Sequence, residues 1–281
     1  MKYVFFDIDG TLRGKSRIIT EKTKDAICQL RENGNKAFLC TGRAPVSITD
    51  DILEIGFDGV ISSAGSFIQI NNQYIYENCL DPHLLEKAIL LFVNAKVGFT
   101  LETKDYLYQS VEAKEFLARR RKKDEATNPE LARFYEQRDN NPRLRPISEF
   151  DVKKDKVTKI VFISYDKYAL LDLVPHLSQD FNVVLFSKME DDFINGEIID
   201  KECTKADAID KVIDYYQGDI KDTIAYGDSM NDYQMLERAH QGIVYEEASE
   251  KLLKIAYDTF IDPDQDGIYE VMKELNLCEE D

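Results

Sequence analysis

The sequence predicts an α/β fold: a core with a parallel sheet, built from both ends of the chain, and a mixed α+β domain inserted between them. Three observations support this. Strand and helix patterns alternate over residues 1–81, the pattern changes over residues 82–197, and the alternation returns over residues 198–281. Repeated strand–helix units favour parallel strands joined by right-handed crossovers. We therefore expect a core domain from the two outer segments and an inserted domain from the middle one.

Residues 1–81 contain alternating strand and helix patterns, which predict the elements of the core in order. Short apolar runs predict buried strands, and apolar residues at helical spacing predict helices between them. In order, we expect a strand at 3–8, a helix at 20–33, a strand at 36–40, a helix at 45–56, a strand near 60–61, and a hairpin of 67–70 with 74–76 across Asn71-Asn72.

The middle and last segments are assigned in the same way. In the middle segment we expect a helix opened by Asp81-Pro82, strands at 99–102, 106–111, 158–164, 182–186 and 193–199, and a helix at 168–177. In the last segment we expect a helix after residue 204, a strand at 223–226, a helix through 235–236, a strand near 243, a helix near 252 and an end helix from 269. Only the outer segments show the regular alternation typical of a parallel sheet.

Composition limits the classes of protein and of partner. The chain has 281 residues, of which 43% are hydrophobic and 32% charged, as in ordinary globular proteins. Its 36 basic and 53 acidic residues give a net charge of -17. An acidic surface repels nucleic acid and anionic membranes, so we expect neither as a partner. A phosphorylated small molecule is compatible, provided that a metal or a local Lys or Arg offsets the charge.

The sequence also predicts a cytoplasmic protein. Asp7 interrupts the first apolar run too early for a signal peptide. The five cysteines are scattered, without a CxxC pair, which is typical of reduced thiols. The oligomeric state cannot be predicted from the sequence.

Two aspartates follow the first predicted strand. Asp7 and Asp9 lie two residues apart, so their side chains point the same way if the strand persists. Gly10-Thr11 then allows a sharp turn that exposes backbone N–H groups. In parallel sheets, ligands lie beyond the carboxyl ends of the strands, which is where these residues fall. An acidic turn without function is the alternative in a chain this rich in acids.

Three further motifs also follow strands or open helices. Thr41-Gly42-Arg43 ends a strand and offers a hydroxyl and free N–H groups to an anion. The segment 227–232, Gly-Asp-Ser-Met-Asn-Asp, ends another strand, and Lys205 opens a helix. Each alone is compatible with an ordinary helix cap or a solvated lysine. Together they supply what phosphoryl transfer requires: carboxylates for Mg²⁺, a nucleophilic carboxylate, a hydroxyl and a lysine.

The order of these motifs resembles the haloacid dehalogenase superfamily. The motif at 7–11, then Thr41-Gly42-Arg43, then Lys205, then 227–232 is similar to its Cof-type phosphatases, which carry an α/β cap in the long insert. The resemblance implies that Asp7 attacks phosphorus and forms an aspartyl phosphate. It implies that Asp9 protonates the leaving oxygen and then activates water. Thr41 and Lys205 would hold the phosphoryl oxygens.

The resemblance also implies a magnesium site and a set of binding residues. It assigns Mg²⁺ to the group Asp7, Asp9 (through its backbone carbonyl), Asp228 and Asp232. Asn231 and Asp232 would position Lys205 and the waters of the metal. The remaining motif residues would line the substrate site: Gly10, Thr11, Gly42, Arg43 and Asn231.

Two segments depart from the pattern of this superfamily. Relatives usually carry Asn-Gly after the third strand, where this chain has Ser63-Ala64-Gly65. Relatives also carry a Gly-Asn-Ala turn after the strand that follows the 227–232 motif, where this chain has Glu246-Glu247-Ala248. The two acids would either approach the phosphate and repel it, or point into solvent and open a helix.

The expected function is that of a phosphoric monoester hydrolase. We expect Mg²⁺-dependent hydrolysis of a small phosphorylated metabolite, either a sugar phosphate or a phosphorylated cofactor. A phosphomutase on the same scaffold is an alternative, which a requirement for a bisphosphate activator would reveal. A regulatory protein that binds a phosphometabolite with little turnover is another, which ligand binding without phosphate release would reveal.

Overall fold

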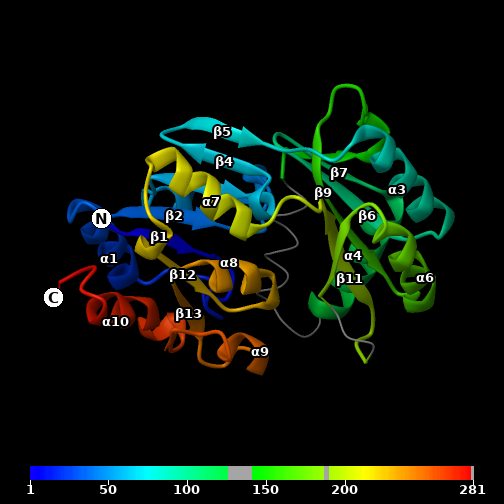
Figure 1. Cartoon of the computed structure of the whole chain (residues 1–281). Coiled ribbons are helices and arrows are strands. Elements are labelled where there is room, and N and C mark those ends of the chain that lie inside the picture. The colour runs from blue at the N-terminus through cyan, green and yellow to red at the C-terminus, as the bar shows by residue number, and fades with distance from the viewer. Residues whose placement is uncertain (126–140, 187–189, 280–281) are drawn as a thin grey trace. The chain divides into compact units, whose positions relative to one another are not determined.

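The computed structural model describes the backbone of residues 1–125, 141–186 and 190–279. The chain divides into two compact units (Figure 1). The first unit contains Met1–Arg43, Ser47–Glu77 and Glu202–Asp281, and the second contains Ala44–Val46 and Asn78–Lys201. The α/β fold class is confirmed. The units change at residues 78 and 202, close to the expected limits of 82 and 197.

The first unit is built on a single sheet in the described part of the chain. Its strand order is β14-β13-β12-β1-β2-β3-β4-β5, with parallel pairing from β14 to β3 and antiparallel pairing of β4 and β5. The strands are β1 Tyr3–Phe6, β2 Lys36–Cys40, β3 Gly59–Ser62, β4 Phe67–Ile70, β5 Gln73–Glu77, β12 Thr223–Gly227, β13 Gln241–Tyr245 and β14 Asp258–Phe260.

Helices cover both faces of this sheet (Figure 1). They are α1 Glu21–Glu32, α2 Asp50–Leu53, α7 Lys205–Tyr216, α8 Tyr233–Arg238, α9 Glu250–Leu253 and α10 Gly267–Glu274. Neighbouring strand residues point to opposite faces: Phe6 stacks on Tyr226 in the core under α1 and α10, whereas Phe5 stacks on Phe38 in the core under α7 and α8. Burial on both faces explains why these strands are continuous apolar runs.

Most predicted elements are present, and the differences have local causes. The first strand ends at Phe6 and not at residue 8, because the chain turns directly after it. The expected helix at 45–56 is a 3₁₀ turn, Pro45–Ser47, followed by the single turn of α2. The strand β14 was not predicted because it has three residues. Asn71 and Asn72 have φ values of 51° and 61°, as the predicted hairpin turn requires.

The second unit has its own sheet, with the strand order β10-β11-β9-β6-β7-β8 in the described residues. The strands are β6 Gly98–Thr103, β7 Leu107–Gln109, β8 Leu144–Pro146, β9 Val157–Ser164, β10 Asn182–Leu185 and β11 Ile194–Ile199, and the helices are α3 Pro82–Asn94, α4 Val111–Glu125 and α6 Lys167–Leu177. Its apolar core includes Phe92, Phe99 and Phe162, whose rings pack together. None of the helices described in either unit is long and apolar enough to cross a membrane.

A partly buried carboxylate connects α1 to the sheet of the first unit. The side chain of Asp58, 10% exposed, accepts hydrogen bonds from Lys36 Nζ at 2.9 Å, the Ala37 N–H at 3.1 Å and Arg31 Nε at 3.0 Å. Burial alone would raise the pKa of this carboxyl, but the hydrogen bonds from Lys36, Ala37 and Arg31 outweigh it and lower the pKa. The Asp58 carboxylate is therefore a stabilising group in its ionised form.

Asp58→Asn is expected to lower the free energy of unfolding by about 2–4 kcal/mol at neutral pH, because charge-assisted hydrogen bonds are lost. Since the folded pKa lies below the unfolded value of about 4, this contribution is complete above pH ~4 and is lost as the pH falls through the folded pKa. Urea unfolding of both proteins at pH 7 and near pH 3 measures it. A difference that is equal at the two pH values would contradict the assignment.

Candidate active site

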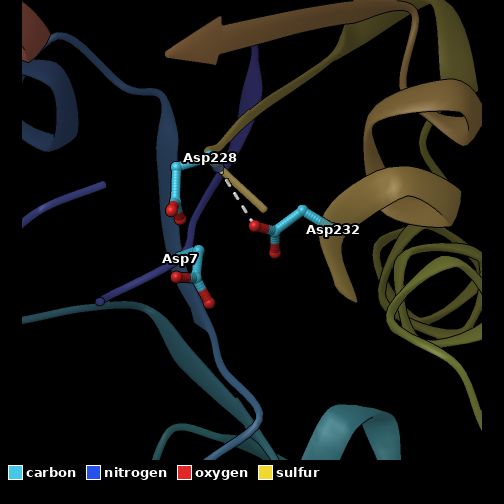
Figure 2. Close-up of side chains that lie close together, drawn as sticks. All are labelled: Asp7, Asp228 and Asp232. Carbon is cyan, nitrogen blue, oxygen red and sulfur yellow. Dashed lines mark hydrogen bonds between the residues drawn. The ribbon is translucent and has the colours of Figure 1, made fainter. Parts of the chain in front are cut away.

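Three carboxylates gather at one edge of the sheet in the first unit. Asp7 follows β1 and Asp228 follows β12, and these strands pair in parallel, so both residues leave the sheet at the same edge. The Asp7 N–H donates to the Tyr226 carbonyl at 3.1 Å, which fixes its position. Figure 2 shows the side chains of Asp7, Asp228 and Asp232 close together. One oxygen from each lies within 4.8 Å of the others.

A single buried ammonium group lies between two of these carboxylates. Lys205 is the first residue of α7, and its side chain is 2% exposed. Its Nζ lies 2.5 Å from Asp7 Oδ1 and 2.6 Å from Asp232 Oδ1. Burial alone would lower the pKa of Lys205, but Asp232 and Asp7 outweigh it and raise the pKa. Lys205 is therefore a permanent cation at this site.

Asp232 organises the loop between β12 and α8. Its Oδ1 contacts Lys205, and its Oδ2 accepts hydrogen bonds from the N–H groups of Asp228 at 3.1 Å and Ser229 at 3.2 Å. Asp232 is fully buried. Both of its oxygens thus have partners in the protein, and it connects the lysine to the loop that carries Asp228.

The group carries more negative than positive charge. Burial, together with Asp232, raises the pKa of Asp7 well above its usual range despite the contact with Lys205. Burial and Asp232 also raise the pKa of Asp228 to about 7. Two oxygens bound to one Mg²⁺ at 2.0–2.1 Å lie up to about 4.2 Å apart, so Asp7 and Asp228 need only a small approach to share a divalent cation. Charge and spacing both fit such an ion.

Gly10 and Thr11, predicted to line the substrate site, both lie against Asp228. Gly10 has a φ of +93°, and a methyl group at this position would overlap the Asp228 carboxylate. Thr11 is fully buried, and its Oγ1 donates to Asp228 Oδ1 at 3.2 Å. These two residues therefore admit and orient the Asp228 carboxylate.

Asp9 does not join the carboxylate group among the described residues. Its side chain is 60% exposed and forms a two-point ion pair with Arg43: Nε donates to Oδ2 at 2.7 Å and Nη2 to Oδ1 at 2.5 Å. The condition under which Asp7 and Asp9 would point the same way is not met, because β1 ends at Phe6 and the chain turns at Gly10. The two side chains therefore have different partners, Lys205 for Asp7 and Arg43 for Asp9.

The Thr41-Gly42-Arg43 loop follows β2, next to β1. Thr41 is 1% exposed, and its Oγ1 accepts a hydrogen bond from the Arg43 N–H at 3.1 Å. A methyl group at Gly42 would lie 3.9 Å from the amide nitrogen of Asn231, so this loop lies near the loop after β12. Asn231 accepts a hydrogen bond from Ser229 Oγ at 2.8 Å. Of the two residues expected to position Lys205, Asp232 contacts it, and the described contacts of Asn231 include none with it.

The two acids that replace a neutral turn are exposed. Glu247 accepts a hydrogen bond from the Tyr245 hydroxyl at 3.1 Å, and Glu246 is bound through its backbone to Phe260. The following helix, α9, begins at Glu250 and not at residue 248. Both side chains are exposed, and neither residue opens the helix.

The contacts of the turn at Ser63–Gly65 could not be predicted from the sequence. This 3₁₀ turn, η2, follows β3, and its backbone N–H groups bind the carbonyls of Arg43 and Thr41. Its departure from the usual Asn-Gly pair was visible in the sequence. The contacts were not, because they join segments about twenty residues apart.

Comparison with known proteins agrees with this geometry. Residues 4–272 match the family of the haloacid dehalogenase-like hydrolases. The chain belongs to this family. It is a phosphatase of the haloacid dehalogenase-like type, and hydrolases of this family generally use a divalent metal.

Similar proteins extend over nearly the whole chain. YkrA of Bacillus subtilis (strain 168) is 27% identical over 98% of this chain and 98% of its own length. From the same organism, phosphatase YwpJ is 23% identical over 98% of this chain and its full length. The 5-amino-6-(5-phospho-D-ribitylamino)uracil phosphatase YwtE is 22% identical over 95% of this chain and 96% of its length.

Solved structures share the fold of this hydrolase. A haloacid dehalogenase-like hydrolase from B. subtilis has a TM-score of 0.80 at 22% identity and covers 98% of this chain and all of its own. The subclass IIB sugar phosphatase BT4131 has a TM-score of 0.78 at 21% identity and covers 99% of this chain and all of its own.

Proposed function

We propose that this hydrolase releases inorganic phosphate from a small phosphorylated metabolite in the presence of Mg²⁺, through an aspartyl phosphate on Asp7. The observation that carries the proposal is the buried group in which Lys205 lies between Asp7 and Asp232, beside Asp228. A nucleophilic carboxylate next to a fixed cation is suited to a phosphoryl group with its negative charge.

The proposed reaction has two steps. A carboxylate oxygen of Asp7 attacks phosphorus, the bond from phosphorus to the ester oxygen breaks, and Asp9 gives that oxygen a proton. In the second step, Asp9 takes a proton from water, which attacks phosphorus, so that phosphate leaves and the Asp7 carboxylate is restored. Thr41 and Lys205 bind the phosphoryl oxygens. Asp9 has to leave Arg43 to reach the leaving oxygen.

The proposed metal ligands are Asp7, Asp228 and the backbone carbonyl of Asp9. Asp232 acts through Lys205 and the loop, since both of its oxygens are bound. Mg²⁺, when bound, would offset the negative charge that crowds around the phosphoryl group. Gly10 and Thr11 hold Asp228, and Gly42, Arg43 and Asn231 complete the substrate side.

The proposed substrate class is a sugar phosphate or a phosphorylated cofactor. It is supported by the names of two similar proteins, the sugar phosphatase BT4131 and the 5-amino-6-(5-phospho-D-ribitylamino)uracil phosphatase YwtE. In the same proposal, residues 82–197 form a cap domain that selects the substrate. The net charge of -17 supports a small-molecule partner over nucleic acid or a membrane surface.

Phosphate release should require the metal. We expect a panel of phosphorylated metabolites to yield activity with Mg²⁺, and the loss of nearly all of it in excess chelator. Three carboxylates, two of them buried, and one lysine leave the site too negative to bind a phosphate dianion. Added Mg²⁺ should restore the activity, which controls for damage by the chelator. Full activity without any divalent ion would refute the metal requirement.

A further inference from the structure

We infer that the turn Ser63–Gly65 is a positioning element of the active site, which holds Arg43 and Lys205 in place from one buried point. The inference rests on the proposed function, because it assigns a role to residues that serve the reaction proposed above. It concerns the first unit alone, in which all the contacts below occur.

The first contact of the turn fixes the loop after β2. The Ser63 N–H donates to the Arg43 carbonyl at 2.7 Å, and the Ala64 N–H donates to the Thr41 carbonyl at 3.0 Å. Ser63 is fully buried and Ala64 is 8% exposed, so these bonds form away from water. They hold the backbone that carries the Thr41 hydroxyl and the Arg43 guanidinium. Through that guanidinium, they also set the position of Asp9.

The second contact fixes the start of α7. A methyl group at Gly65 would overlap the carbonyl oxygen of Thr204 and come within 3.5 Å of the side chain of Ala208. Thr204 is the N-cap of α7, where its hydroxyl accepts a hydrogen bond from the Asp207 N–H, and Lys205 is the first helical residue. The absence of a side chain at Gly65 therefore lets the turn pack directly on the residue that sets the position of Lys205.

The backbone of the turn is unusual in a way that these contacts explain. Ser63, Ala64 and Gly65 have successive φ values of 48°, 55° and 109°. Positive φ is unfavourable for Ser and Ala, and such conformations persist only where the surroundings enforce them. This conformation directs two consecutive N–H groups to two carbonyls of one loop while the next residue contacts Thr204. The strained backbone of the turn is therefore what allows it to contact both the loop at 41–43 and Thr204.

The expected effect falls on the rate of the reaction more than on binding. Lys205 and Arg43 contact the proposed nucleophile and the proposed acid, and a displacement of about 1 Å can lower a rate by about a hundredfold. Gly65→Ala should displace Thr204 and with it Lys205. We expect kcat to fall at least about tenfold, with KM within about twofold of the wild-type value, for the best substrate of the panel.

Gly34→Ala is the matched control. Gly34 also has a positive φ, of +81°, but a methyl group there meets nothing within 4 Å. Both variants share the cost of an alanine at positive φ, and both should show a lower Tm, but only Gly65→Ala should lose kcat. Wild-type kcat in folded Gly65→Ala, or an equal loss of kcat in Gly34→Ala, would overturn the inference.

A second pair of variants tests the positioning role of the turn if Gly65→Ala does not fold. Glycine accepts the φ of Ala64 readily, whereas the β-branched valine does not. Ala64→Gly should therefore keep kcat and Ala64→Val should lose it, and equal kcat values for the two would overturn the inference.

Asp7→Asn in the same assay separates the positioning role of the turn from the proposed function. If it is inactive while Gly65→Ala is fully active, only the positioning role fails, whereas an active Asp7→Asn variant refutes the proposed mechanism itself.

Discussion

Asp7→Asn is expected to abolish phosphate release, with kcat lower by more than about 10³-fold, and to leave the fold intact. An amide is not a competent nucleophile for the covalent step, so no aspartyl phosphate can form. The protein should stay folded because burial and Asp232 already disfavour the ionised form of Asp7. Its folded pKa lies above the unfolded value, so ionisation of Asp7 costs stability at neutral pH and the neutral amide removes that cost.

Phosphate release, Tm and the mass of the protein mixed rapidly with substrate are the measurements. The wild-type protein should show a transient mass increase of one phosphoryl group, and the variant should show none. Asp222→Asn, which changes a half-buried aspartate paired with Lys2, is the control and should keep full turnover. Turnover of the Asp7 variant near the wild-type value would rule out the covalent mechanism.

Lys205→Met should be the most destabilising single change in the site. It leaves Asp7 and Asp232 buried without their cation, and breaking a buried ion pair in this way typically costs about 3–5 kcal/mol. Activity should fall as well, because the position that binds the phosphoryl oxygens becomes apolar. The free energy of unfolding in urea and the rate of phosphate release measure the two effects.

The second unit offers a matched control for this variant. Lys159 is also buried, with its side chain 6% exposed, and its Nζ lies 3.0 Å from Glu197 and 3.3 Å from Glu102. Lys159→Met should therefore cost a similar free energy, yet it should retain most of the kcat for a small phosphate ester. If both variants lose stability and activity in parallel, the loss in Lys205→Met is structural and the lysine has no separate role in the reaction.

The sequence determined the elements whose pattern is local. The strand β2 was predicted with its observed bounds, Lys36–Cys40, because a buried parallel strand is a continuous apolar run. The helix α1 begins after the Thr20 cap and ends before Gly34, since capping and termination depend on adjacent residues. The motifs were also located from the sequence, because each one follows a strand or opens a helix.

Tertiary structure decided which of these residues meet. Lys205 and Asp7 are 198 positions apart, and only the packing of α7 at the edge where β1 ends brings them within 2.5 Å. Asp7 and Asp9 are two residues apart in the sequence, but their side chains have different partners. The backbone turns after Phe6, which places Asp7 in the buried group and Asp9 beside Arg43. Spacing along the chain fixes side-chain direction only while the strand continues.

The turn at Ser63–Gly65 shows the same limit most clearly. Its sequence gives three small residues, and its conformation is set by carbonyls of the loop at 41–43 and by Thr204, which are distant in the chain. The sequence by itself determined the fold class and the positions of the chemical groups. Their contacts were decided by the tertiary structure, because hydrogen bonds and buried charges depend on the distances between segments that only the folded sheet brings together.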